Sequence, residues 1–192
     1  MTKANKRRAQ AARQTRQIPW LWIGLGVAAI AIVAILIFSA TVSAPKAIER
    51  IEIFPNITAG HTEAAVTYPQ TPPVGGQHDP RWQNCGIYDQ PLRNENAVHS
   101  MEHGALWITY KPDLPADQVS QLQNLARGQR YVLLSPFEGL PSPIVASGWG
   151  AQIKMENAND SRLPNFISTY QNGPFTPERG ATCAGGLGTP LG

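Results

Sequence analysis

The middle of the chain reads NAVHSMEHGALWITY over residues 96–110. Its second part, Leu106 to Tyr110, is rich in β-branched and aromatic side chains and predicts a strand. Its first part carries His99 and His103, four positions apart. This spacing puts both imidazoles on one face of a helix, and an even spacing also puts both on one face of a strand. The pair is therefore a candidate site under either secondary structure.

The segments on either side of this stretch predict a small α+β domain. The region Pro115 to Arg127 predicts a helix with Asp113 as its cap, an apolar stripe and a stop at Gly128. On the other side, the region Pro69 to Asn96 is rich in Pro, Gly, Asn and Asp, and predicts a long irregular loop of the kind that often carries function. Further strands are predicted near residues 48–54, 64–68, 131–134 and 144–149, and a second helix over residues 162–170.

The N-terminus contains a hydrophobic span. The run from Trp20 to Phe38 has no charged residue, and six basic residues and no acidic ones precede it. Such a run is long enough to cross a bilayer, and the basic tail favours a cytoplasmic N-terminus. We therefore expect a cytoplasmic tail (1–19), a transmembrane helix (20–39), a linker (40–47) and an extracytoplasmic domain (48–192). A signal peptide cleaved after Val42-Ser43-Ala44 is the alternative.

The net charge of +3 reflects this topology. Six of the sixteen basic residues lie in the tail, so ten remain in the rest of the chain against thirteen acidic residues. The predicted external part therefore carries about −3 and lacks a basic patch, which argues against nucleic-acid binding. The expected partners are the lipid bilayer, through the single helix, and a membrane protein complex.

Both cysteines, Cys85 and Cys183, lie in the predicted external part. An extracytoplasmic compartment permits a disulfide, and two cysteines allow only one intramolecular pairing. The alternative is that Cys85 serves as a thiolate metal ligand.

All four histidines also lie in the predicted external part, and they suggest a copper or zinc site. If His99 and His103 lie on a strand, Met101 joins their face, and its thioether favours copper. If they lie on a helix, Glu102 joins them instead, which favours zinc. His61 follows Gly60, and His78 follows Gly75 and Gly76, where the backbone can bend to present an imidazole.

The same pentad fits the pattern His-x-x-Glu-His of a class of zinc proteases, in which two histidines hold zinc and the glutamate acts as base. A third ligand would then come from Glu178 or Glu156. The chain is short for that class, so we expect a binding or accessory protein rather than an enzyme.

Several short motifs in order resemble the DUF3105 family of bacterial proteins. They are Tyr68-Pro69, Pro72 to His78, Trp82, Cys85 to Tyr88, Asn96 to Ala105 and Tyr110 to Pro112, and the likeness extends from about His61 to Cys183. This resemblance implies one N-terminal membrane helix, and it implies that His78, Cys85, His99, Glu102, His103 and Cys183 occupy motif positions. The family has no established activity to carry over.

From these features we expect a membrane-anchored extracytoplasmic domain that binds copper or zinc through His61, His78, His99, His103 and Met101, with Glu102 in support. Such a domain would take part in metal handling or act as accessory to a membrane complex. The alternatives are a structural subunit without a metal and a zinc-dependent hydrolase.

Overall fold

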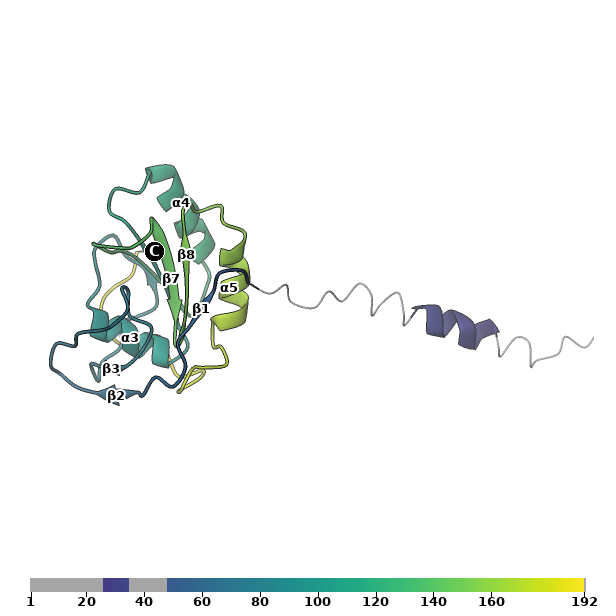
Figure 1. Cartoon of the computed structure of the whole chain (residues 1–192), viewed down its shortest axis with the longest axis horizontal. Helices are drawn as coiled ribbons and strands as arrows, with labels where there is room; N and C mark the ends of the chain where they lie inside the picture. Colours follow the sequence, from purple (N-terminus) through teal and green to yellow (C-terminus); the bar gives the residue numbers. More distant parts are fainter. Residues whose placement is uncertain (1–25, 35–47, 192) are drawn as a thin grey trace, which may run out of the picture. The chain divides into compact units, whose positions relative to one another are not determined.

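The computed structural model describes residues 26–34 and 48–191. Residues 26–34 are helical and belong to the predicted membrane span, while the rest of that span, the predicted tail and the predicted linker lie outside the described residues. Among the residues that the structure describes, no helix is both long and apolar enough to cross a membrane. The unit Ala47–Gly192 contains the fold and the site described below (Figure 1).

The core of this unit is a mixed six-stranded sheet with the strand order β1-β8-β7-β5-β6-β4. Strands β4, β5 and β6 are parallel, whereas β7 is antiparallel to both β5 and β8, and β1 is antiparallel to β8. Every residue of β5 is buried, because this strand has a neighbour on each side and a packed layer on each face. The strands are β1 (Glu52–Ile53), β4 (Gly86–Ile87), β5 (Leu106–Tyr110), β6 (Val132–Pro136), β7 (Ile144–Gly148) and β8 (Ala151–Met155).

Two helices cover one face of the sheet. Helix α4 (Ala116–Ala126) links the parallel strands β5 and β6, as a parallel pair requires, and α5 (Arg162–Tyr170) follows β8. Both helices contribute to one apolar cluster with every second residue of β5. This cluster includes Leu106, Ile108, Tyr110, Leu122, Ala126, Leu163 and Phe166. We call this side of the sheet the apolar face.

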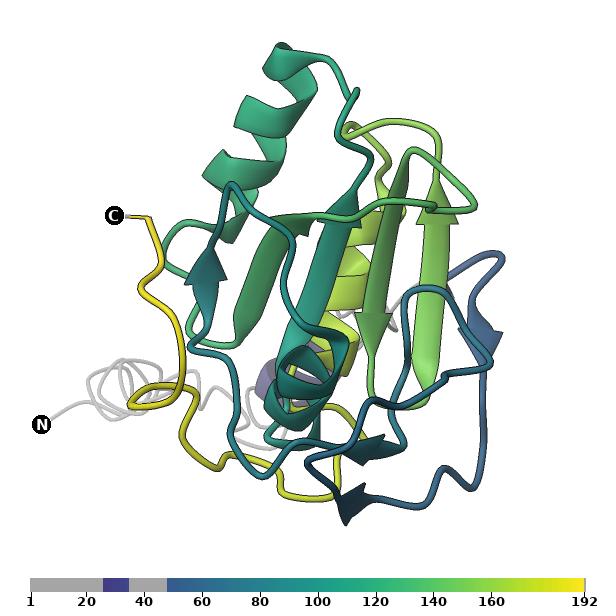
Figure 2. The same cartoon turned by 90° about the vertical axis from the view of Figure 1, so that its left-hand side faces the viewer.

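Helix α3 (Asn94–Glu102) covers the opposite face, where Trp107 of β5 packs with Ala97, Val98 and Met101. Strand β3 (Gln77–His78) lies against α3 and pairs in parallel with β2 (Gly60–His61). Figure 2 shows α3 in front of the sheet and α5 behind it. We call this side, with α3, β2 and β3, the histidine face.

The C-terminal segment is tied to the histidine face by a disulfide between Cys85 and Cys183, with the two Cα atoms 5.4 Å apart. The predicted pairing is therefore confirmed. Because both sulfurs are bonded to each other, Cys85 offers no thiolate to a metal, and the alternative role for it is wrong. Further along, Leu187 and Leu191 form isolated bridges with Gln83 and Ile87.

The domain is mixed α and β with a sheet core, and most predicted elements are present. Strand β8 has no counterpart in the prediction, and neither do the two-residue strands β2, β3 and β4, of which β3 and β4 lie within the predicted irregular loop. The predicted strand at residues 64–68 is absent because Val66 donates its N–H to the carboxylate of Glu95 rather than to a neighbouring strand. Asp113 does not cap α4, since Pro115 occupies the cap position without a side-chain hydrogen bond.

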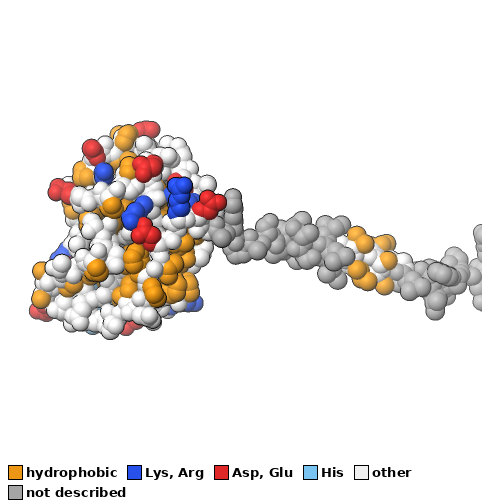
Figure 3. Space-filling model, viewed as in Figure 1, with side chains coloured by type: hydrophobic (Ala, Val, Ile, Leu, Met, Phe, Trp, Pro, Cys, Tyr) orange, Lys and Arg blue, Asp and Glu red, His pale blue; other side chains and the backbone are white. Residues whose placement is uncertain are grey.

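The surface carries charges of both signs. On the face shown in Figure 3, basic and acidic side chains lie close together above an area of hydrophobic atoms. Two ion pairs join side chains of opposite sign at 2.6 Å, Lys154 with Glu52 and Arg162 with Asp160. Neither sign forms a continuous area on this face.

Candidate metal centre

Helix α3 and the two short strands β2 and β3 bring four ligand-type side chains together. Helix α3 carries His99 and Glu102 three positions apart, so both side chains lie on one face of the helix. Opposite them, the parallel register of β2 and β3 sets His61 directly beside His78. The ligand atoms of these four residues all lie within 4.8 Å of one another. We call this set the His₃Glu cluster.

A glycine turn presents His78 to the helix. Gly75 and Gly76 have φ angles of +133° and +118°, a region that side-chain-bearing residues rarely adopt. The turn then enters β3, and the carbonyl oxygen of Gly76 lies 2.8 Å from Nδ1 of His78. The expectation that these glycines let the backbone bend toward a histidine is thus consistent with the observed geometry.

The distances within the His₃Glu cluster are close to those of a metal site. Nε2 of His78 lies 2.9 Å from Oε2 of Glu102, and Nε2 of His61 lies 3.7 Å from the same oxygen. Zinc ligands sit about 2.0–2.2 Å from the ion, so tetrahedral neighbours lie about 3.4 Å apart. The widest pair must therefore close by about 1.4 Å. The side chain of His61 is 51% exposed, whereas those of the other three residues are buried, so packing restrains His61 least.

Three histidines have their tautomer set by the backbone. In each of them, Nδ1 faces a carbonyl oxygen, which can only accept a hydrogen bond, so Nδ1 carries the hydrogen and a neutral ring has a bare Nε2. The same device orients histidine ligands in metal sites. The pairs are His78 with Gly76 at 2.8 Å, His99 with Asp79 at 2.6 Å and His103 with Thr182 at 2.6 Å.

Because their Nε2 atoms carry no hydrogen, the three histidines have too few hydrogens for the close contacts that they make with one another and with Glu102. Nε2 of His99 lies 3.0 Å from Nε2 of His103, and Nε2 of His78 lies 2.9 Å from the Glu102 carboxylate. With the three Nδ1 contacts, five short contacts each need one hydrogen, but three neutral imidazoles supply only three. The geometry therefore calls for two more positive charges, as protons or as a divalent cation.

Burial opposes the supply of one of those charges as a proton on His99. Desolvation by burial has the largest effect and lowers the pKa of His99, and the neighbouring His103 and His78 lower it further. The hydrogen bond that Nδ1 of His99 donates to the Asp79 carbonyl and the charge of Glu102 oppose this shift without reversing it. A neutral His99 keeps its Nε2 lone pair free for a metal at neutral pH.

Two tryptophan rings pack against the histidines. The ring centroid of Trp149 lies 6.0 Å from that of His78, and the ring centroid of Trp82 lies 5.7 Å from that of His99 and 5.1 Å from that of His103. Apolar walls lower the local dielectric, which strengthens the attraction between a cation and its ligands.

The exposed Arg93 joins two buried carboxylates at the start of α3. Asp79, whose backbone carbonyl accepts from His99, has its carboxylate 2.7 Å from Nη1 of Arg93. Burial alone would raise the pKa of Asp79, but hydrogen bonds from Arg81 and Arg93 hold it below its ordinary value. Arg93 also contacts Glu95 at 3.0 Å, so the loop and the helix are joined by charge-assisted bonds.

The helical conformation of residues 94–102 decides whether Met101 or Glu102 lies beside the histidines. Glu102 lies in the His₃Glu cluster, whereas Met101 is fully buried in the apolar cluster between α3 and the sheet, with Trp107 and Val98. His103, at the end of α3, contacts His99 but lies outside the group of four. The structure thus brings together His61, His78, His99 and Glu102, with His103 adjacent.

The two acidic residues considered as a further zinc ligand differ in position. Oε2 of Glu178 lies 3.5 Å from Nε2 of His103, whereas Glu156 follows β8 and is exposed. In the hydrolase hypothesis Glu102 is a base beside the metal. Here its carboxylate contacts His78 and His61 and has the place of a ligand.

Sequence reasoning missed the backbone carbonyls of Gly76, Asp79 and Thr182, which fix the three tautomers. A carbonyl is common to every residue, so no side-chain pattern could have identified them.

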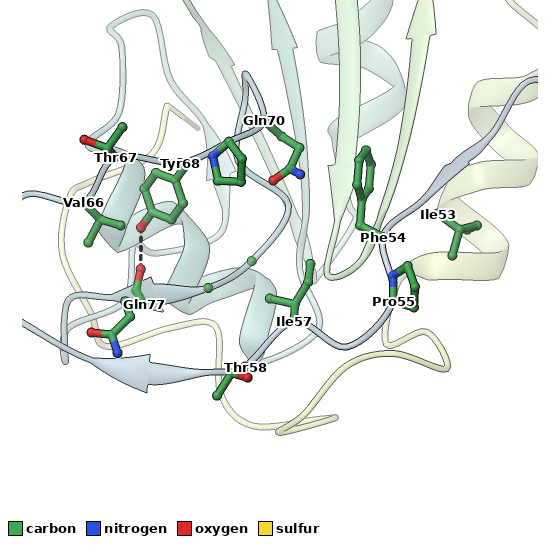
Figure 4. A pocket seen from close by; sticks show the side chains of 13 residues that line it. Ile53, Phe54, Pro55, Ile57, Thr58, Val66, Thr67, Tyr68, Gln70 and Gln77 are labelled. Carbon is green, nitrogen blue, oxygen red and sulfur yellow. Dashed lines mark hydrogen bonds between the residues drawn. The ribbon is translucent and has the colours of Figure 1, made fainter.

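A separate hollow of about 480 Å³ lies beside the strand that carries His78. Its lining includes Ile53, Ile57 and Tyr68, and it ends at Gly75, Gly76 and Gln77, directly before that histidine (Figure 4). The Tyr68 hydroxyl donates to the Gln77 carbonyl at 2.6 Å. Burial raises the pKa of Tyr68, so this hydroxyl remains a donor at neutral pH. None of the side chains of the His₃Glu cluster lines the hollow, and its connection to the site is strand β3, which carries both Gln77 and His78.

Comparison with known proteins agrees with the resemblance seen in the sequence motifs. The model of the family described as "Protein of unknown function (DUF3105)" matches residues 61–185, a region that includes every residue of the His₃Glu cluster and both cysteines. No curated protein and no solved structure matches the chain. Because the family model covers well over half of its length, this chain belongs to the DUF3105 family.

Proposed function

We propose that this protein binds one divalent transition metal ion, zinc or copper, through His61, His78, His99 and Glu102. The observation that carries the proposal is the shortage of hydrogens among the buried contacts of the cluster. The lone pairs of His78 and His99, together with the Glu102 carboxylate, are held within reach of one another without enough protons between them. A divalent cation supplies the missing charge without requiring a buried imidazolium.

The donor set favours zinc(II) or copper(II). It consists of three imidazole nitrogens and one carboxylate oxygen, which are borderline ligands that both ions accept. Copper(I) prefers thioether and thiolate sulfur, but Met101 lies in the apolar cluster and the cysteines form a disulfide.

We also propose that the domain is anchored at the outer surface of a membrane. The support is the uncharged run from Trp20 to Phe38 and the six basic residues before it. External protease added to intact cells or spheroplasts should then digest the chain beyond Pro45. Digestion that begins only after the membrane is broken would contradict this topology.

The metal proposal is tested on the full chain purified in detergent. Metal content and thermal unfolding are measured with and without zinc or copper, for the wild type and for His99→Ala, Glu102→Gln and Glu138→Gln. Glu138 is an exposed acid outside the cluster and gives a matched control for the charge lost at Glu102.

We expect the wild type and Glu138→Gln to bind one equivalent of metal. At a free concentration of 100 times the dissociation constant, bound metal should add about 2.7 kcal/mol to the free energy of unfolding. His99→Ala and Glu102→Gln should lose this stabilisation. Equal behaviour of all four proteins, or no binding by the wild type, would favour a structural cluster without a metal.

A further inference from the structure

We infer that the centre has a second, overlapping position for the metal ion, formed by His99, His103 and Glu178, and that the ion passes between the two positions by exchanging ligands around His99. This inference rests on the proposed function, and it makes the protein one that transfers a metal rather than one that keeps it. The position formed by the His₃Glu cluster is called the inner position here, and the new one the outer position.

In the outer position, Nε2 of His103 lies close to a ligand atom of each of the other two residues. Nε2 of His103 lies 3.0 Å from Nε2 of His99 and 3.5 Å from Oε2 of Glu178. Adjacent ligands at about 2.0–2.2 Å from one ion are separated by about 2.9–3.4 Å. His103 is available as a ligand, because its Nδ1 donates to the Thr182 carbonyl and its Nε2 is bare. The outer position therefore has two nitrogens and one carboxylate oxygen.

His99 belongs to both positions but can serve only one ion at a time. Its Nδ1 is committed to the carbonyl of Asp79, so the ring has a single lone pair, on Nε2. That lone pair faces His103 at 3.0 Å and also lies within the group of His61, His78 and Glu102. Occupation of the two positions is therefore mutually exclusive, and an ion bound to His99 can exchange its other ligands without becoming free.

Each of the two positions has one ligand that is exposed to solvent. The side chain of His61 is 51% exposed and that of Glu178 is 56% exposed, whereas the side chains of His78, Glu102 and His103 are almost fully buried. The buried ligands thus lie between two that reach solvent. An ion can enter at one exposed ligand, be held at the buried nitrogens and leave through the other.

A permanently held metal would not need this second set. If the inner position held a resident ion, removal of Glu178, which lies outside the group of four, would leave both the affinity and the rate of release unchanged. A ligand that contacts the ion only as the ion leaves changes the rate of release much more than it changes the equilibrium affinity. This difference is what the experiment measures.

The test uses the full chain loaded with zinc and mixed with an excess of a chromophoric chelator. The rate of zinc release and the equilibrium affinity are measured for the wild type, Glu178→Gln, His103→Ala and Glu138→Gln. Glu178 is exposed, so its replacement by Gln keeps the size of the side chain and does not disturb the core. Glu138→Gln removes an exposed carboxylate elsewhere and serves as control.

We expect Glu178→Gln and His103→Ala to release zinc at least about tenfold more slowly than the wild type, which corresponds to a barrier to release that is higher by about 1.4 kcal/mol. The affinity should fall by no more than about twofold, the loss expected when one of two equally populated positions is removed. Glu138→Gln should match the wild type, and the wild type should bind a single equivalent.

Unchanged release in both variants, faster release in either, or two equivalents bound by the wild type would each overturn the inference. Faster release would make Glu178 and His103 ordinary stabilising ligands, and two equivalents would show that His99 is not shared. These results differ from failure of the proposed function, in which the wild type binds no zinc at all.

Discussion

The apolar face and the histidine face share one sheet but are held together by different interactions. On the apolar face, Leu163 and Phe166 of α5 are fully buried among aliphatic side chains of the strands. On the histidine face, eight consecutive residues of α3 are buried, and four of them have charged or imidazole side chains or amide groups. The first face gains its free energy from apolar area removed from water, and the second needs a partner for each polar atom.

This contrast explains how rigidly each face must be built. An apolar contact is non-directional, so α5 tolerates a small shift with little loss. The hydrogen bonds of His78, His99 and His103 require particular carbonyls at 2.6–2.8 Å, so the loops that carry those carbonyls must be fixed. The disulfide and the Asp79–Arg93 ion pair provide that restraint.

The largest effect is expected from removing the disulfide with the double substitution Cys85→Ser and Cys183→Ser. The bond closes a loop of 98 residues, so its loss should lower the free energy of unfolding by up to about 5 kcal/mol. It also anchors Thr182, whose carbonyl faces His103. Hydrogen exchange should therefore accelerate more at α3 than at α5, and equal acceleration in the two helices would contradict this comparison.

Phe166→Ala tests the apolar face. Phe166 is fully buried between α5 and the sheet, so its truncation should cost about 3–5 kcal/mol in urea unfolding. Phe175→Ala, at a site that is 43% exposed, should cost much less. The folded fraction of the Phe166 variant should bind zinc as the wild type does, and weakened binding would show that the two faces are coupled.

Gly76→Ala tests the histidine face through its backbone. With φ at +118°, an alanine there should cost about 1–2 kcal/mol and displace the carbonyl that orients His78, so metal affinity should fall. Gly128→Ala, after α4 at φ +77° and with open space around it, should cost a similar amount. Calorimetric titration with zinc should show reduced affinity only in the Gly76 variant.

The smallest effect is expected at the start of α5, where Asp160→Asn removes an ion pair with Arg162. The hydrogen bond from Arg162 lowers the pKa of Asp160 although burial opposes it. The stabilisation should therefore be present above the unfolded pKa of about 3.9 and disappear as the pH falls through the lower folded value. We expect a loss of about 1 kcal/mol at pH 7 that vanishes in acid.

The control for this substitution is Asp89→Asn, since Asp89 is exposed. Unfolding in urea at several pH values measures both variants. A deficit at Asp160 that does not shrink as the pH falls below about 3.9 would contradict the ion pair as its cause.

The elements on the apolar face could be predicted closely. Strand β5 and helix α5 have the bounds expected from residue type and spacing, because the periodicity of their apolar side chains matches the geometry of a strand or a helix. Strand β8 was missed although its residues alternate between apolar and polar, which is the pattern of a strand with one covered face. Gln152 is nevertheless buried, and its side chain donates to Ser147 and Pro72.

By itself, the sequence determined which residue types are available: four histidines, two cysteines that pair, and a pentad whose histidines lie on one face in either secondary structure. Only the tertiary structure decided that the pentad is helical, that Glu102 rather than Met101 joins the cluster, and that His61 lies beside His78. The physical reason is that local periodicity fixes the direction of a side chain on its own element. The loops and carbonyls that such a side chain contacts depend on tertiary packing, which brings together residues as far apart in the chain as His103 and Thr182.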